Sequence, residues 1–403
     1  MHLFASLSGN VMVGSRLLTS GPIMRLSLFS VPISGGPDSD RAIIFDVIDR
    51  AALADSLGFF CLYYPEHHFD DYCPWADNML LVAHLAATVR RAHLGLSIAI
   101  APFHHPVALA ERAALMSQLT DGKFILGVGS GGVPLESTGM GFDPATQGEE
   151  LESIVVAVEK LWAKRPADPP VDFSTRRYAG KVVQRIMPAS AGSPPVIKLA
   201  CVRPDRALLA ATKGWAVFTG EKIAPVYVRA LLDAGHAEET VARCLAYSSI
   251  SVGPMHVAET DTLARTELIA ALQTRQQWLD RQKMLETRHN LGNPLMVPAP
   301  DYASEAYLSA RCLYGSPATV LARMRSLARL GFGEILGESD VGLNTPERMA
   351  AVRRSITLLG QEVIPVLNGI VPANTQEAAA SVDRVVQAEV HPAFGEAPHA
   401  PAG

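Results

Sequence analysis

Three apolar segments in the first third of the chain each end in a cluster of polar or small residues: FFCLYYPEHHF (59–69), HLGLSIAIAPFHHP (93–106) and GKFILGVGSGG (122–132). Each segment has the length and apolar composition of a buried strand, and a helix-like stretch follows it. Polar residues that gather at the carboxyl ends of successive parallel strands are typical of the active site of a (β/α)8 barrel. The three segments therefore predict an enzyme with a pocket at one end of such a barrel.

The rest of the chain continues the alternation of strand and helix. The expected strands occupy residues 24–31, 59–64, 94–100, 124–129, 196–201, 215–219 and 334–337, and a seventh strand is expected within residues 241–252. The expected helices occupy residues 39–57, 77–89, 106–119, 148–162, 204–213, 224–234, 316–330 and 346–367, with a mostly helical insertion at 256–291 after the seventh strand. A doubly wound sheet shows the same alternation, but it rarely needs eight strand–helix units. The pattern therefore favours an α/β fold of the (β/α)8 (TIM) barrel type.

Composition marks the expected domain boundaries. Residues 1–23 are expected to be a disordered N-terminal extension, residues 24–370 the barrel, and the Ala/Pro-rich residues 371–403 a disordered tail. Residues 164–195 are rich in Pro, Gly and Ser, and we interpret them as a long connection between the fourth helix and the fifth strand.

Charge and cysteine usage exclude several classes of function. The net charge of −5 over 403 residues, without a Lys/Arg block, gives no electrostatic support for a nucleic-acid or anionic-membrane partner. The five cysteines are scattered and show no CxxC spacing, which argues against a disulfide framework or a structural zinc and fits the cytoplasm. No stretch approaches the ~20 consecutive apolar residues of a membrane-spanning helix.

The histidines at the strand ends are candidates for chemistry. Adjacent residues that leave a strand point in opposite directions, so at most one of His67 and His68 is expected to face the pocket. That imidazole could be a general acid/base or donate a hydrogen bond to a bound anion. Metal ligation together with His104 or His105 is an alternative, and so is a purely structural role in the turn. We expect no metal, because a metal site needs further converging ligands.

Two further segments are typical of ligand contacts. The glycines of GVGSGG (127–132) do not lead directly into a helix, so a dinucleotide-binding loop is a weaker interpretation than a strand end that lies against a flat ligand. Pro204 suits the first turn of a helix, and Arg203 and Arg206 beside it predict a phosphate site at the helix N-terminus. The alternative is that both arginines lie on the surface and pair with Asp205 or Glu221.

Taken together, these segments resemble the luciferase-like flavin-dependent monooxygenases. The resemblance rests on EHHF (66–69), on residues 101–132, on residues 314–336 and on EVIPVL (362–367). Residues 101–132 and the segment ESDVG (338–342) are most similar to the limonene-monooxygenase-type branch of that family.

The resemblance implies a TIM barrel that binds reduced FMN at its C-terminal mouth. Such enzymes are two-component: a separate NAD(P)H-dependent flavin reductase supplies the reduced FMN. Dioxygen then forms a flavin C4a-hydroperoxide, which would here oxygenate a small or medium apolar organic substrate. The family also implies a homodimer and a mouth closed by mobile segments, for which residues 132–147 and 256–313 are candidates.

The resemblance also assigns roles to individual residues. His67 matches the catalytic histidine, and a non-prolyl cis peptide that contacts the flavin ring falls near Ser97-Ile98. The cofactor-binding residues are expected to be Ser97, Ile98, Ser130, Gly131, Val202, Arg203 and Arg206. Substrate specificity is expected from the insertion, from residues 132–147 and from Phe29, Tyr64, Phe103 and Phe142.

The chain departs from the luciferase pattern at some of these positions. Ser130 stands where luciferase has an arginine, Val202-Arg203 where it has a glutamate–serine pair, and Gly129 where it has a reactive cysteine. Bioluminescence is therefore not implied, and Arg203 and Arg206 are expected to supply the missing positive charge.

Three alternative functions stay open from the sequence. A sister enzyme that transfers hydride with a flavin or deazaflavin and without oxygen would have the same barrel. A flavin-binding protein without turnover would also have it. A metal-dependent hydrolase would use His67, His68 and His105.

Overall fold

The computed structural model describes residues 23–291, 301–374 and 377–378. Eight strands form a closed ring in which every neighbouring pair is parallel. In ring order they are β1 (Arg25–Phe29), β2 (Cys61–Tyr64), β3 (His93–Leu96), β5 (Phe124–Gly129), β8 (Val196–Cys201), β9 (Ala216–Thr219), β10 (Ser249–Val257) and β12 (Glu334–Glu338). The pairs β9–β10 and β12–β1 close the ring, so the predicted (β/α)8 barrel is confirmed.

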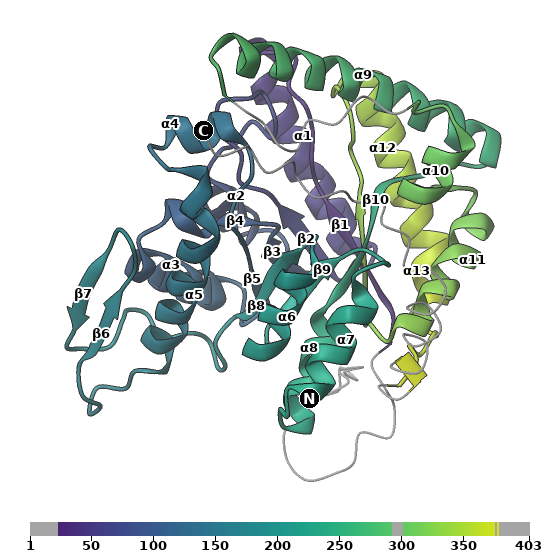
Figure 1. Cartoon of the computed structure of the whole chain (residues 1–403). Helices are drawn as coiled ribbons and strands as arrows, with labels where there is room; N and C mark the ends of the chain where they lie inside the picture. Colours follow the sequence, from purple (N-terminus) through teal and green to yellow (C-terminus); the bar gives the residue numbers. More distant parts are fainter. Residues whose placement is uncertain (1–22, 292–300, 375–376, 379–403) are drawn as a thin grey trace, which may run out of the picture.

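Helices surround the barrel (Figure 1). They are α1 (Pro37–Ser56), α2 (Asn78–Leu85), α3 (Pro106–Leu119), α5 (Gln147–Ala163), α6 (Pro204–Lys213), α7 (Ala224–Asp233), α8 (Glu238–Tyr247), α11 (Pro317–Leu327), α12 (Pro346–Leu358) and α13 (Ile364–Leu367). Among the described helices none is long and apolar enough to cross a bilayer.

Smaller elements complete the connections. The strand β4 (Ala99–Ile100) pairs with β5, and β11 (Leu313–Gly315) pairs with β10. The helix α4 (Pro134–Gly139) follows β5, while α9 (Asp261–Arg288) and α10 (Glu305–Arg311) lie between β10 and β11. The long α9 extends across one end of the molecule, above α1 and α12 in the view of Figure 1.

The structure corrects some of the predicted elements. Within the stretch 241–252, which is expected to contain the seventh strand, residues 241–247 belong to the helix α8 and the strand β10 begins at Ser249. Glu238 and Glu239 favour a helix there, because acidic side chains stabilise a helix N-terminus. The expected connection 164–195 contains an antiparallel hairpin, β6 (Val171–Ser174) and β7 (Ala179–Val182). The expectations for residues 1–22 and 379–403 lie outside the described residues.

A buried ion pair occupies the barrel interior. Lys198 Nζ lies 2.9 Å from Glu334 Oε2, and both side chains are fully buried. The ammonium group also donates to Ser249 Oγ at 2.9 Å and to the Tyr63 hydroxyl at 3.0 Å. Because the charge is paired and hydrogen-bonded, it can remain in a site without water. The ion pair and its two hydrogen-bond partners connect four strands of the ring, β2, β8, β10 and β12, through their side chains.

Candidate active site

The loop after β2 carries the candidate acid/base residue. His67 Nδ1 lies 2.9 Å from Oε1 of Glu136 in α4, and the same oxygen accepts the backbone N–H of His68 at 2.9 Å. Asp70 Oδ2 lies 3.9 Å from His67 Nδ1. The His67 side chain is 22% exposed, whereas Glu136 is buried. Glu136 therefore fixes the imidazole through Nδ1, and Nε2 has no hydrogen-bond partner among the described residues.

The surroundings of His67 favour its protonated form. Burial disfavours the imidazolium, but the hydrogen bond and charge of Glu136 outweigh it and raise the pKa of His67 above its ordinary value. Burial raises the pKa of Asp70 to about 7, although the charge of His67 opposes this shift. A cationic imidazole with Nε2 available is suited to donate a proton near neutral pH.

Glu66 connects the loop after β2 with the segment after β4. Its Oε1 lies 3.0 Å from His68 Nε2, and its Oε2 lies 2.9 Å from His104 Nε2. Oε2 also accepts the backbone N–H of Ile100 at 2.7 Å. Burial alone would raise the pKa of Glu66, but the hydrogen bonds from His104 and His68 lower it to about 2. The adjacent histidines contact different carboxylates, since His67 bonds Glu136 and His68 bonds Glu66.

The end of β5 packs against the segment between β3 and β4. The Ser97–Ile98 peptide is cis, as the family resemblance implies. A Cβ atom on Gly127 would lie 1.8 Å from the carbonyl oxygen of Leu96, and one on Gly129 would lie 2.3 Å from Ile98 Cδ1. These two glycines therefore allow a close approach of β5 to its neighbouring segment, whereas the sequence interpretation assigned that approach to a ligand.

The two arginines near α6 have different environments. Arg203 is 63% exposed and pairs with Asp205 at 2.9 Å, as in the alternative interpretation of the sequence. Arg206 is 18% exposed, and its Nη1 donates to the carbonyl oxygen of Gly148 in α5 at 3.3 Å. Arg206 therefore joins the first turns of α5 and α6. Val202, which precedes both arginines, is 85% exposed.

Ser130 and Gly131 lie directly after β5. Ser130 is partly exposed, and its hydroxyl donates only to the neighbouring carbonyl oxygen of Gly131, at 3.2 Å, within the described part of the chain. Gly131 has a φ of 75°, a conformation that favours glycine. The turn thus presents a hydroxyl group that is available to a ligand.

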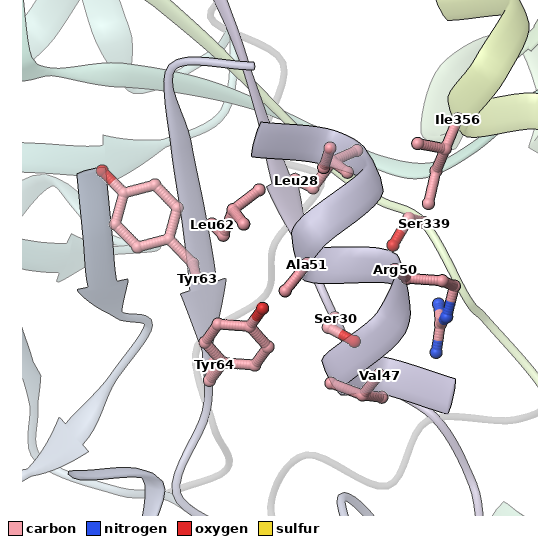
Figure 2. A pocket seen from close by; sticks show the side chains of 11 residues that line it. Leu28, Ser30, Val47, Arg50, Ala51, Leu62, Tyr63, Tyr64, Ser339 and Ile356 are labelled. Carbon is pink, nitrogen blue, oxygen red and sulfur yellow. The ribbon is translucent and has the colours of Figure 1, made fainter. Parts of the chain in front are cut away.

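The aromatic residues expected near the substrate divide into two groups. Phe103 and Phe142 pack against each other with ring centroids 4.9 Å apart, and Phe29 is partly exposed at the end of β1. The expectation for Tyr64 is wrong. Tyr64 is 3% exposed and lines a cavity of about 20 Å³ between α1 and the barrel wall. Figure 2 shows Tyr63 and Tyr64 leaving β2 in different directions, as alternation in a strand requires.

The histidines expected for a metal-dependent hydrolase are not brought together. His105 Nδ1 accepts the backbone N–H of Val107 at 3.2 Å, and its ring lies 4.7 Å from that of Tyr178. Within the described ranges, His67, Asp70 and Glu136 are the one group of three whose ligand atoms lie within 4.8 Å of one another. Hydrogen bonding to His67 explains the position of Glu136, so the geometry does not require a metal there.

The helix α9 is fastened to the loop that carries His67. Trp278 Nε1 and Gln282 Nε2 both donate to the carbonyl oxygen of Asp70, at 2.5 and 2.9 Å. The rings of Trp278 and Tyr72 stack at 4.9 Å, and the ring of Tyr72 contacts His67 at 4.6 Å. The helix α9 therefore packs against the loop that carries His67.

Comparison with known proteins identifies the family. The family described as luciferase-like monooxygenase matches residues 24–334. The chain belongs to this family. Limonene 1,2-monooxygenase from Rhodococcus erythropolis is a relative of this luciferase-like protein, with 26% identity over 84% of this chain and 88% of the relative.

Solved structures of luciferase-like monooxygenases share the fold. A monooxygenase from Streptomyces bottropensis superposes with a TM-score of 0.68 at 22% identity and covers 85% of this chain and 99% of its own. The oxygenating constituent of 3,6-diketocamphane monooxygenase from Pseudomonas putida, solved in complex with FMN, has a TM-score of 0.67 at 19% identity and covers 87% and 100%.

Sequence reasoning missed two carboxylates of the site, Glu136 and Asp70. It also missed that Glu66 hydrogen-bonds both His68 and His104. Glu136 is far from His67 along the chain, so no local spacing links them. The one local signal is Pro134, which suits the first turn of a short helix and would have predicted α4 within the loop 132–147.

Proposed function

We propose that this protein is the oxygenase component of a two-component flavin-dependent monooxygenase. It would use reduced FMN and dioxygen to oxygenate a small or medium organic substrate. The observation that carries the proposal is the His67–Glu136 pair at the carboxyl end of β2, in which the carboxylate raises the pKa of a partly exposed imidazole. Membership of the luciferase-like family supports the same conclusion.

The residues beside the mouth fit a flavin phosphate. Arg203 makes no side-chain cap at the N-terminus of α6, so the amide of Asp205 is available to an anion, whereas the next amide, that of Arg206, donates to the Asp205 carboxylate. Arg206 adds a cation there, and Ser130 adds a hydroxyl group at the end of β5. In this proposal Arg206, Ser130 and Gly131 hold the phosphate, and Ser97 and Ile98 lie against the flavin ring. Arg203 and Val202 contribute less, because both are exposed.

His67 would act as the proton donor and acceptor for the reacting oxygen atoms. Bound reduced FMN supplies the electrons that activate dioxygen. Glu136 keeps Nδ1 of His67 occupied, so the proton moves at Nε2. The helix α9 and the Phe103–Phe142 pair would limit access of water, which otherwise diverts such a reaction to hydrogen peroxide.

The partners are part of the same proposal. A separate NAD(P)H-dependent reductase would supply reduced FMN by diffusion in the cytoplasm. A homodimer is supported by large apolar side chains exposed on α2 and α3, among them Leu80 at 71% and Leu115 at 47%. Light scattering of the purified protein would test the dimer.

The test combines cofactor binding with isotope labelling. Anaerobic titration with reduced FMN is expected to show saturable binding. Admission of ¹⁸O₂ with a terpene substrate is then expected to place the label in the product, as measured by mass spectrometry. His67→Gln should bind reduced FMN normally and lose about a hundredfold or more of the oxygenation rate, which is the usual contribution of a general acid/base.

Other outcomes would indicate the rival functions. If the protein transfers hydride with a deazaflavin under anaerobic conditions, the oxygen-independent enzyme is the correct function and the monooxygenase proposal is wrong. Tight binding of reduced FMN, with no labelled product from a broad panel of substrates, would favour a flavin-binding protein without turnover.

A further inference from the structure

An ion pair links the insertion to the end of a barrel strand close to His67. Arg275 of α9 donates through Nη1 to Glu338 Oε2 at 3.0 Å, and Glu338 is the last residue of β12. The two side chains are 26% and 20% exposed, so neither is sealed in the core. An interaction between part-exposed groups at a strand end can be contacted by a ligand, unlike the sealed Lys198–Glu334 pair.

The ion pair reaches the candidate catalytic residue through Tyr72, whose ring contacts His67 and stacks on Trp278, one helical turn from Arg275. Tyr72 contacts the His67 ring, and burial raises the pKa of Tyr72 while the nearby charge of Arg275 opposes this shift. Part-buried aromatic side chains, three of them near Arg275, belong to one apolar cluster that includes residues of α9 and α10. They include Phe29, Tyr72, Tyr302, Tyr307 and Tyr314.

The pair leaves hydrogen-bonding capacity unused. Arg275 has five N–H donors, and only Nη1 bonds a described residue; Nε and Nη2 have no such partner. Glu338 balances the charge of the guanidinium and would repel an anion. A fixed donor in a charge-balanced, aromatic setting is suited to a neutral acceptor such as a carbonyl oxygen.

We propose that Arg275, held by Glu338, binds the carbonyl oxygen of an apolar ketone substrate beside His67. The inference rests on the proposed function for the reaction, but the binding step itself needs no flavin. It distinguishes this protein from an enzyme that takes a pure hydrocarbon, since a hydrocarbon would leave the Arg275 donors without a partner.

The test uses two ligands with one carbon skeleton. Carvone is limonene with an added ketone, and their affinities can be measured by equilibrium dialysis against the full-length, flavin-free protein. Carvone is expected to bind at least about tenfold more tightly than limonene, the factor of one charge-assisted hydrogen bond. Arg275→Met should abolish this preference and leave limonene affinity within about twofold. Arg281→Met, an exposed arginine on the same helix, is the matched control and should keep the preference.

A second variant keeps the inference falsifiable if Arg275→Met does not fold, as judged by its near-UV circular dichroism. Glu338→Gln removes the negative charge, so perillate, the carboxylate with the same skeleton, should gain about tenfold in affinity. Equal binding of carvone and limonene by the wild type, an unchanged preference in Arg275→Met, or no gain of perillate in Glu338→Gln would overturn the inference.

The two proposals fail separately in this design. If the wild type does not bind reduced FMN but prefers carvone to limonene, the monooxygenase proposal is wrong and the proposed ketone site stands. Normal binding of reduced FMN without the carvone preference would remove only the ketone site.

Discussion

Glu136 Oε1 lies 2.9 Å from His67 Nδ1, although the two residues are 69 positions apart in the chain. The short helix α4 presents the carboxylate, and the loop after β2 presents the imidazole. The bond sets both the orientation of the ring and the charge that it carries.

Replacing Glu136 by Gln should lower the pKa of His67. The raised pKa depends on the charge of Glu136, while burial, which lowers it, remains in the variant. The pH range over which His67 is protonated should therefore move to lower pH, and the alkaline limb of the oxygenation rate should move with it. NMR titration of the His67 ring measures the shift directly. Glu149→Gln, at an exposed position of α5, is the control, and an equal shift in that variant would contradict the assignment.

Glu66 should make stability fall in acid. Its pKa is lowered to about 2 by hydrogen bonds that exist only in the folded state. A carboxyl group with a lowered folded pKa stabilises the protein above its unfolded pKa of about 4.5, and this contribution is lost as pH falls towards about 2. The loss is on the order of 3 kcal/mol, and Glu66→Gln should remove this part of the pH dependence. Urea unfolding at several pH values checks it, and parallel curves for both proteins would refute the role.

Arg206 should matter more for cofactor binding than Arg203. Arg206 is largely buried against the first turn of α5, whereas Arg203 is exposed and already paired. Arg206→Ala should raise the Kd for reduced FMN about tenfold, because it loses a charge-assisted hydrogen bond. Arg203→Ala should change it by less than about threefold, since exposed pairs contribute little. Anaerobic fluorescence titration of both variants measures the difference, and the reverse order would contradict the proposed phosphate site.

Lys198 should stabilise the folded protein only while Glu334 carries its negative charge. Removing one partner leaves the other charge buried, so Lys198→Met should cost about 3–5 kcal/mol of unfolding free energy. The double variant Lys198→Met/Glu334→Met should recover most of that loss, because it removes both buried charges. Equilibrium denaturation of the two variants is the measurement. A double variant as unstable as the single one would show that the polar network with Ser249 and Tyr63 contributes independently.

Local patterns predicted the barrel well because each strand carries its own signal. The apolar runs at β2 and β5 and the proline at the start of α3 determine local structure by themselves. The start of the seventh strand within 241–252 could not be located, because an apolar run that follows Glu238 and Glu239 suits a helix as well as a strand. In the hairpin β6–β7 only β6 (VDFS) alternates apolar and polar residues, and four residues are too few to indicate a strand by themselves.

Site residues were predicted only where a polar side chain directly follows the end of a strand. His67 and Arg206 could be found in that way, but the importance of Glu136 comes from a contact between distant loops. Arg275 was hidden for the same reason, because its partner Glu338 lies on a strand that is 63 positions away. Closure of the barrel decides which side chains meet across its mouth, and local sequence patterns carry no information about such contacts.

The two hydrogen bonds from α9 to the carbonyl oxygen of Asp70 limit which residues can change during the evolution of such a protein. Trp278 and Gln282 bond the same carbonyl oxygen, so a change at either residue would disturb the loop that carries His67. Positions on the outer face of the helix, such as Arg281, carry no such constraint. New substrate preferences in related proteins should therefore arise by substitutions in the region that lies between these two residues and the end of β12. Trp278 and Gln282 themselves should remain unchanged.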